Sequence, residues 1–138
     1  MNIRSLAAWV GRLAVAAGFL SAVADRFGAW GAPGQPRVAW GDWAHFVGYT
    51  GQLNWFVPGA LVPAVAIVAT VAEVALAILL LIGYRLRLVA YASAALLFLF
   101  AAAMTVALGV KSPLDYSVFA AAAAAFLLGA NAPVTRRR

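Results

Sequence analysis

Long uncharged apolar segments constrain this chain more than any other feature. A helix needs about 20 apolar residues to cross a bilayer core of roughly 30 Å, and four segments approach or reach this length. They are residues 5–24, 59–82, 88–108 and 113–130, of which the last is the shortest. Hydrophobic residues make up 66% of the 138 residues and charged residues only 10%, whereas a soluble domain has about a quarter charged residues. Backbone amides inside a bilayer must be paired within their own segment, which favours helices. The sequence therefore predicts an all-α membrane protein: a single domain in which four transmembrane helices form an antiparallel bundle.

The first apolar segment has an alternative interpretation. The letters "MNIR", an apolar stretch and "AVA" before Asp25 resemble a secretory signal with its cleavage site. Arg12 interrupts the apolar stretch, however, and signal peptides tolerate such an interruption poorly. We therefore expect this segment to remain as a transmembrane helix.

The basic residues predict the orientation in the membrane. With four spans both termini lie on one side, and that side collects seven of the ten Lys and Arg residues. They are Arg4, Arg12, Arg85, Arg87, Arg136, Arg137 and Arg138. Positive residues accumulate on the cytoplasmic side, so both termini are expected in the cytoplasm. Because these arginines lie at helix ends, they suit anionic lipid headgroups, and no nucleic-acid partner is expected.

Cysteine and histidine usage excludes several kinds of site. The chain has no cysteine, which excludes a dithiol centre, an iron–sulfur cluster and an internal disulfide. His45 is the single histidine, so no histidine-rich metal site is expected. Phosphate-binding and dinucleotide-binding motifs are also absent from the sequence. Any electron transfer would therefore need a diffusible carrier or a partner.

Glu73 is the single charge within the apolar stretch 68–83. Arg12 lies about 12 Å from the cytoplasmic end and Glu73 about 15 Å from it, at about 1.5 Å of rise per residue. These matching depths predict an ion pair between them. Residues on the Glu73 face are small or weakly polar, and a stripe of small residues on the first segment would pack against it. The residues of the Glu73 face are Ala66, Thr70 and Ala77. The stripe on the first segment consists of Ala14, Gly18 and Ala22.

Three interpretations of Glu73 remain open at this stage. The pair with Arg12 serves either as a structural clamp or as part of a ligand or proton site, because ionisable residues inside a membrane often mark function. Alternatively, Trp9 marks the cytoplasmic interface, Arg12 reaches out to lipid phosphates, and Glu73 is protonated and unpaired or has another partner.

The outer loop, residues 28–57, contains four of the five tryptophans. Asp42 is expected to cap a short helix from Trp43 to about Tyr49, lying at the membrane surface. Aromatic residues gather at that depth because they are amphipathic. Alternatively, the loop is a lid over a cavity that opens to the outer leaflet. In that case Glu73 would reach the polar floor of the cavity, and His45 and Tyr49 would offer hydrogen bonds to a polar head group.

The stretch "KSPLDYSVF", residues 111–119, has a structural interpretation. Ser112 is a good N-cap, Pro113 suits the first helical position, and Asp115 lies three residues after the cap. Lys111 is placed to pair with Asp115 or with Asp25.

Several landmarks resemble the DoxX family of small bacterial membrane proteins. They are "GFLSAVADRFG", the aromatic loop, "ATVAEVALAILLLIGYRLRLVA" and "KSPLDYSVF". The resemblance implies a four-helix bundle in the bacterial cytoplasmic (inner) membrane, and it implies a link to quinone, because the family is named after a subunit of a thiosulfate–quinone oxidoreductase. It also implies that five residues line the polar features of the bundle: Arg12, Asp25, Arg26, Glu73 and Arg85.

Three functions remain possible from the sequence. The first is an anchoring or quinone-contacting membrane subunit of an oxidoreductase, with quinone as the possible cofactor. The second is a proton-coupled exporter acting as a dimer, and the third is a structural or assembly protein without a ligand. The candidate ligand-binding residues are Glu73, Arg12, Trp43, His45 and Tyr49; the candidate structural polar residues are Asp25, Arg26, Lys111 and Asp115. Besides membrane lipids, the expected partner is a second copy of the chain or a redox subunit.

The orientation can be tested with single cysteines introduced at Gln35 and Thr135 of this cysteine-free chain. An impermeant thiol reagent added to intact cells should label the first, which is expected outside, and not the second. Labelling of the cysteine at Thr135 alone would reverse the assigned orientation.

Overall fold

Three helices of this chain are long and apolar enough to cross a membrane. In the computed structural model, which describes residues 2–132, they are α1 (Ile3–Asp25), α3 (Val62–Ile82) with the 3-10 turn η1 (Gly59–Leu61) before it, and α4 (Leu86–Leu108). The shorter helices are α2 (Trp43–Leu53), α5 (Lys111–Asp115) and α6 (Val118–Asn131). The described part of the chain contains no strand. The protein is thus an all-α, multi-pass membrane protein.

The fourth predicted span is broken. Tyr116 and Ser117 separate α5 from α6, and Ser117 has a positive φ of 55°, which few residues other than glycine adopt. The 14 residues of α6 extend only about 21 Å at about 1.5 Å per residue. The structure therefore has three full-length candidate spans and a shorter apolar helix, so the expected bundle of four spans is not confirmed.

The expected cap at Ser112 is wrong. Helix α5 begins at Lys111, one residue before Ser112, and its cap residue Val110 makes no side-chain hydrogen bond. The preceding Gly109 has a φ of 86°, which lets the chain turn from α4 into α5 without a polar cap. Asp115 instead pairs with the exposed Lys111 one helical turn away.

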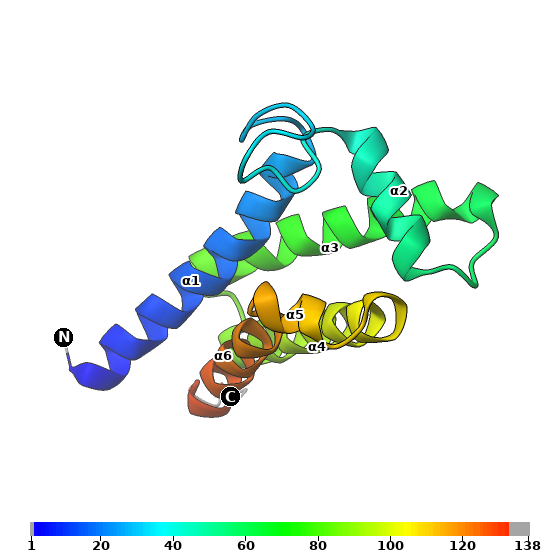
Figure 1. The fold of residues 1–138 in the computed structure, drawn as a ribbon. Helices are drawn as coiled ribbons and strands as arrows, with labels where there is room; N and C mark the ends of the chain where they lie inside the picture. The colour runs from blue at the N-terminus through cyan, green and yellow to red at the C-terminus, as the bar shows by residue number, and fades with distance from the viewer. Residues whose placement is uncertain (1, 133–138) are drawn as a thin grey trace.

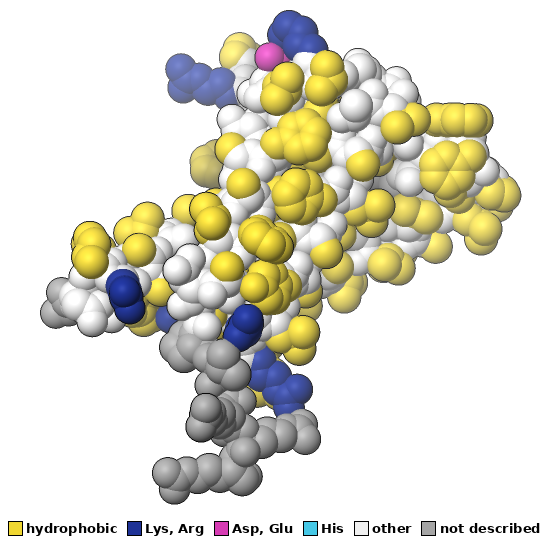
Figure 2. Space-filling model, turned by 90° about the horizontal axis from the view of Figure 1, so that it is seen from below, with side chains coloured by type: hydrophobic (Ala, Val, Ile, Leu, Met, Phe, Trp, Pro, Cys, Tyr) yellow, Lys and Arg dark blue, Asp and Glu magenta, His cyan; other side chains and the backbone are white. Residues whose placement is uncertain are grey.

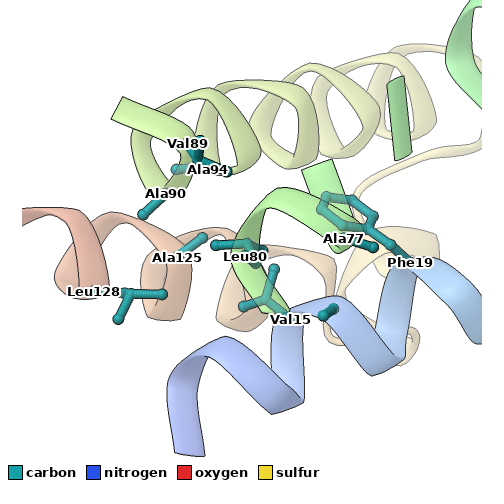
Figure 3. Close-up of a cluster of buried hydrophobic side chains, with 10 residues drawn as sticks. Val15, Phe19, Ala77, Leu80, Val89, Ala90, Ala94, Ala125 and Leu128 are labelled. Atoms are coloured by element: carbon teal, nitrogen blue, oxygen red, sulfur yellow. The ribbon is translucent and has the colours of Figure 1, made fainter. Parts of the chain in front are cut away.

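The hydrophobic core lies where α1, α3, α4 and α6 meet (Figure 3). Val15 and Phe19 come from α1, and Leu80 comes from α3. The remaining core residues are mostly alanines, which allow helix backbones to approach closely. They include Ala77, Ala90, Ala94 and Ala125.

The long helices pack at one end and leave space at the other. Core residues lie at 77–80 in α3 and 89–94 in α4, on either side of the turn that joins these two helices. The core residues of α6, at 125–128, lie near the end of that helix. Figure 1 shows the start of α1 and the end of α6 on the side of the molecule away from α2. Helix α2 contacts α3 and α4. The fold thus combines a packed end with an end covered by α2.

The surface suits a membrane. Figure 2 shows Lys and Arg side chains at two ends of one face, with hydrophobic side chains over the middle. The lipid-facing side chains of α3, such as Val68, Val71 and Ile82, are exposed. The apolar belt between charged ends is the pattern expected of a bilayer-spanning protein.

Candidate functional site

A cavity of about 1100 Å³ lies among α1, α2, α3, α4 and α6. Its walls are mainly apolar and include Phe19, Leu97, Phe100 and Met104. Small-molecule sites usually measure about 300–1000 Å³, so the cavity is large enough for a lipid-sized ligand. Glu73, Arg26 and Asp25 form its charged part.

The small-residue stripe of the first helix lines this cavity. Ala14, Gly18 and Ala22 were expected to pack against the Glu73 helix, but all three face the open space. Val15, Ala16 and Phe19 provide the buried surface of α1 instead. Small side chains permit close packing but do not require it, and here they leave room.

Glu73 forms an ion pair with Arg26. Arg26 Nη2 lies 2.5 Å from Glu73 Oε2, and both side chains are almost fully buried. Arg26 Nη1 donates a hydrogen bond to Thr70 Oγ1 at 2.6 Å. The guanidinium also lies over the ring of Phe46, with its central carbon 3.8 Å from the centroid. Residues from the end of α1, from α2 and from the middle of α3 are therefore joined around one charge.

Two polar groups of this pair keep unused hydrogen-bonding capacity. Arg26 Nε is buried and donates to no residue that the structure describes, and the ion-pair contact at Glu73 Oε2 lacks hydrogen-bond geometry. Since buried polar groups are normally satisfied, this end of the cavity is suited to a polar group of a ligand.

Asp25 holds the loop that follows α1. Its carboxylate accepts backbone hydrogen bonds from Ala39 at 2.9 Å and from Trp40 and Gly41 at 2.8 Å. Gly41, with a φ of 75°, lies against the backbone of Pro33, where a Cβ would clash. These contacts fix Trp40 in the cavity wall, near the guanidinium of Arg26.

Asp42 caps α2, as the sequence predicted. Its Oδ1 accepts a hydrogen bond from the backbone N–H of His45 at 2.8 Å, and the ring Nδ1 of His45 lies at the same distance. Both hydrogen bonds lower the pKa of Asp42 below its usual value, and the bond from the backbone N–H makes the larger contribution. The helix continues to Leu53, one turn beyond the expected Tyr49.

The predicted pair between Arg12 and Glu73 is wrong. Arg12 Nε donates to the carbonyl oxygen of Leu80 at 2.7 Å, and Nη2 donates to that of Leu81 at 2.6 Å. The last carbonyls of a helix have no partner within the helix and carry partial negative charge, so they attract the guanidinium. Counting residues gave the depth of each backbone position but ignored the reach of the long arginine side chains.

The cavity brings together only some of the predicted ligand-binding residues. Glu73, His45 and Tyr49 line it, whereas Arg12 and Trp43 do not. Trp43 instead stacks on Phe27, with the ring centroids 5.8 Å apart.

Among the other predicted polar residues, Asp25 and Arg26 line the cavity. Lys111 and Asp115 pair on the surface outside it. Arg85 lies over the ring of Tyr84 at the turn between α3 and α4.

Sequence reasoning missed the central role of Arg26 and the apolar wall. Arg26 directly follows α1, and a charge at a helix end usually suggests only an interface anchor. Phe100 and Met104 lie in an apolar segment that carries no signal of its own. Within residues 2–132, no group of three or more His, Asp and Glu residues is placed to bind a metal.

Fold and site together define a small multi-pass membrane protein with a large apolar cavity closed at one end by a buried ion pair. Residues 4–117 match the family model described as methylamine utilisation protein MauE, and the chain belongs to this family. The DoxX resemblance is therefore wrong, because the matching model is that of a different membrane family. No curated protein and no solved structure matched the chain.

The pair can be tested with a double-mutant cycle. Glu73→Gln and Arg26→Gln should each destabilise the protein by about 3–5 kcal/mol, since each leaves a buried charge unpaired. The double variant should lose much less than the sum of the two. Unfolding in detergent measures these losses, with Arg12→Gln combined with Glu73→Gln as the control that should be additive. Additive losses for Arg26 and Glu73 would contradict the coupling.

Proposed function

We propose that this chain is a membrane accessory protein of a methylamine-utilisation system and that its cavity binds a lipid-like molecule on behalf of a partner protein. The family supports the first part. The single observation that carries the second part is the cavity itself: an apolar space of about 1100 Å³ that ends at Arg26 and Glu73. Such a space suits an apolar chain with one polar head.

The orientation of the chain belongs to this proposal. We place both termini in the cytoplasm and α2 on the outer side of the cytoplasmic (inner) membrane. The distribution of basic residues supports this. The cavity would then lie in the outer half of the bilayer, where a partner on the outer side can reach it.

A quinone is the ligand that we propose for the cavity. Its ring would lie near Phe46 and Tyr49, and a ring carbonyl would accept a hydrogen bond from Tyr49 or His45, both of which line the cavity. Its tail would extend between Phe19, Phe100 and the bilayer. The chain has no cysteine and would need a partner to supply or take up electrons, so the isolated protein should bind quinone without turning it over.

The accessory role predicts a growth defect. Deleting the gene in its bacterial host should prevent growth with methylamine as sole nitrogen source and leave growth on ammonium unchanged. A plasmid copy of the natural chain should restore growth, and so should Asp115→Asn, which changes only a surface pair. Normal growth of the deletion strain on methylamine would refute the role.

The cavity predicts a selective effect of filling it. An added Cβ at Gly18 meets nothing within 4 Å, and leucine forms helix better than glycine, so Gly18→Leu should fold and occupy the cavity. A short-tailed quinone should raise the melting temperature of the natural chain by mass action, and Gly18→Leu should abolish that rise.

The matched control is Ala17→Leu, at an exposed neighbouring position outside the cavity wall. It should retain the full rise in melting temperature. An equal rise in Gly18→Leu and Ala17→Leu would place quinone binding elsewhere on the protein.

A further inference from the structure

Glu73 offers the cavity a hydrogen-bond acceptor that the protein does not use. The residue is 3% exposed and lines the cavity. Its one charged contact among the described residues is Arg26 Nη2 at Oε2, and this buried oxygen has no hydrogen-bond partner between residues 2 and 132. A carboxylate can accept about four hydrogen bonds, so a ligand at this end of the cavity can donate to it.

The charges around Glu73 restrict the head group of that ligand. Asp25 and Glu73 carry negative charges and Arg26 carries a positive one, and all three line the cavity. An anionic head would add a third negative charge beside a guanidinium that already pairs with Glu73. A cationic head would be attracted by the excess carboxylate, but the Asp25 carboxylate is occupied by backbone N–H groups, and at Glu73 the cation would lie beside the guanidinium of Arg26. At low dielectric such like-charge contacts are strongly unfavourable.

Asp25 does not offer the ligand a second hydrogen-bond acceptor. Backbone N–H groups of Ala39, Trp40 and Gly41 already occupy its carboxylate. The face of the guanidinium is covered by Phe46, and Trp40 lies nearby. Glu73 therefore remains the acceptor for a ligand, and a neutral donor meets no like charge there.

We propose that the cavity selects a neutral amphiphile whose hydroxyl group donates a hydrogen bond to Glu73 and whose chain lies along Phe19, Leu97 and Phe100. This inference rests on the proposed function of the cavity and adds the chemistry of the head group. Among quinone-type lipids it favours the reduced, dihydroxy form over the oxidised form, because a quinone carbonyl cannot donate.

The test uses four probes that share one chain and differ only in the head: dodecanol, dodecyl methyl ether, dodecanoate and dodecylammonium. Each is added to the full-length protein in phosphatidylcholine nanodiscs, and the melting temperature is followed against probe concentration. Dodecanol should bind about tenfold or more tightly than the ether, which accepts but cannot donate a hydrogen bond. The two charged probes should also bind more weakly than dodecanol.

Variants locate the effect. Glu73→Gln should reduce the preference for dodecanol over the ether, and Asp115→Asn should leave it unchanged. If Glu73→Gln does not fold, the probe series on the natural chain still decides, because a stronger shift with the ether, the carboxylate or the ammonium would overturn the inference. Equal shifts with all four probes would also overturn it, since they indicate only an apolar chain in the cavity.

The outcome separates this inference from the proposed function. If Gly18→Leu weakens binding of every probe equally but no head is preferred, the cavity binds lipid-like molecules and only the hydroxyl preference fails. If no probe and no quinone changes the melting temperature of the natural chain, the ligand-binding function of the cavity fails as well.

Discussion

A charged side chain inside a helix bundle in a membrane is stable only if an opposite charge and further polar contacts accompany it. Arg26 and Glu73 meet this condition together, and much of the half of the molecule that carries α2 is arranged around them. Thr70 accepts from the guanidinium, and Phe46 covers its face. Through these contacts the end of α1, the middle of α3 and helix α2 form one connected unit. The packed core at the other end is built mainly from apolar side chains, and its buried Ser93 is satisfied by the carbonyl oxygen of Val89.

The same ion pair makes one end of the cavity polar while the rest of its wall is mainly apolar. Its walls are apolar, and the charges are gathered where Asp25, Arg26 and Glu73 lie. An amphiphile can satisfy such a space in only one way, with its chain against the walls and its head at the charges. The MauE family assignment gives the biological setting, and the task that we propose for the cavity within that setting is to bind such an amphiphile.

Local signals in the sequence predicted the helix cap at Asp42 and the buried face of α3 correctly, but the expected cap at Ser112 was wrong. The cap at Asp42 depends on residues three positions apart, and the structure contains it. The buried face of α3 follows from helical periodicity, so Ala66, Thr70, Glu73 and Ala77 are all buried together. The length of apolar segments was enough to indicate a multi-pass helical protein.

Other features depended on information that the sequence does not carry locally. The partner of Glu73 depends on how far an arginine side chain reaches, and Arg26 and Arg12 both reach α3. The stripe of Ala14, Gly18 and Ala22 fits either close packing or open space. The helix break at Ser117 has a positive φ without a glycine at that position, so the sequence gives no local sign of it. Apolar helices also resemble one another across families, which is why DoxX was the wrong family.

The break before α6 has a consequence for the surrounding lipid. An uninterrupted helix of about 21 Å is about 9 Å shorter than a hydrocarbon core of roughly 30 Å. If α6 crosses the bilayer, local thinning is one way to relieve such a hydrophobic mismatch, at a fraction of a kcal/mol per Å. Val118 and Ala121, at the start of α6, line the cavity. Thinned lipid on this side would bring headgroups and water closer to the cavity, and an amphiphile could then exchange with the membrane without moving its head through the full depth of the hydrocarbon.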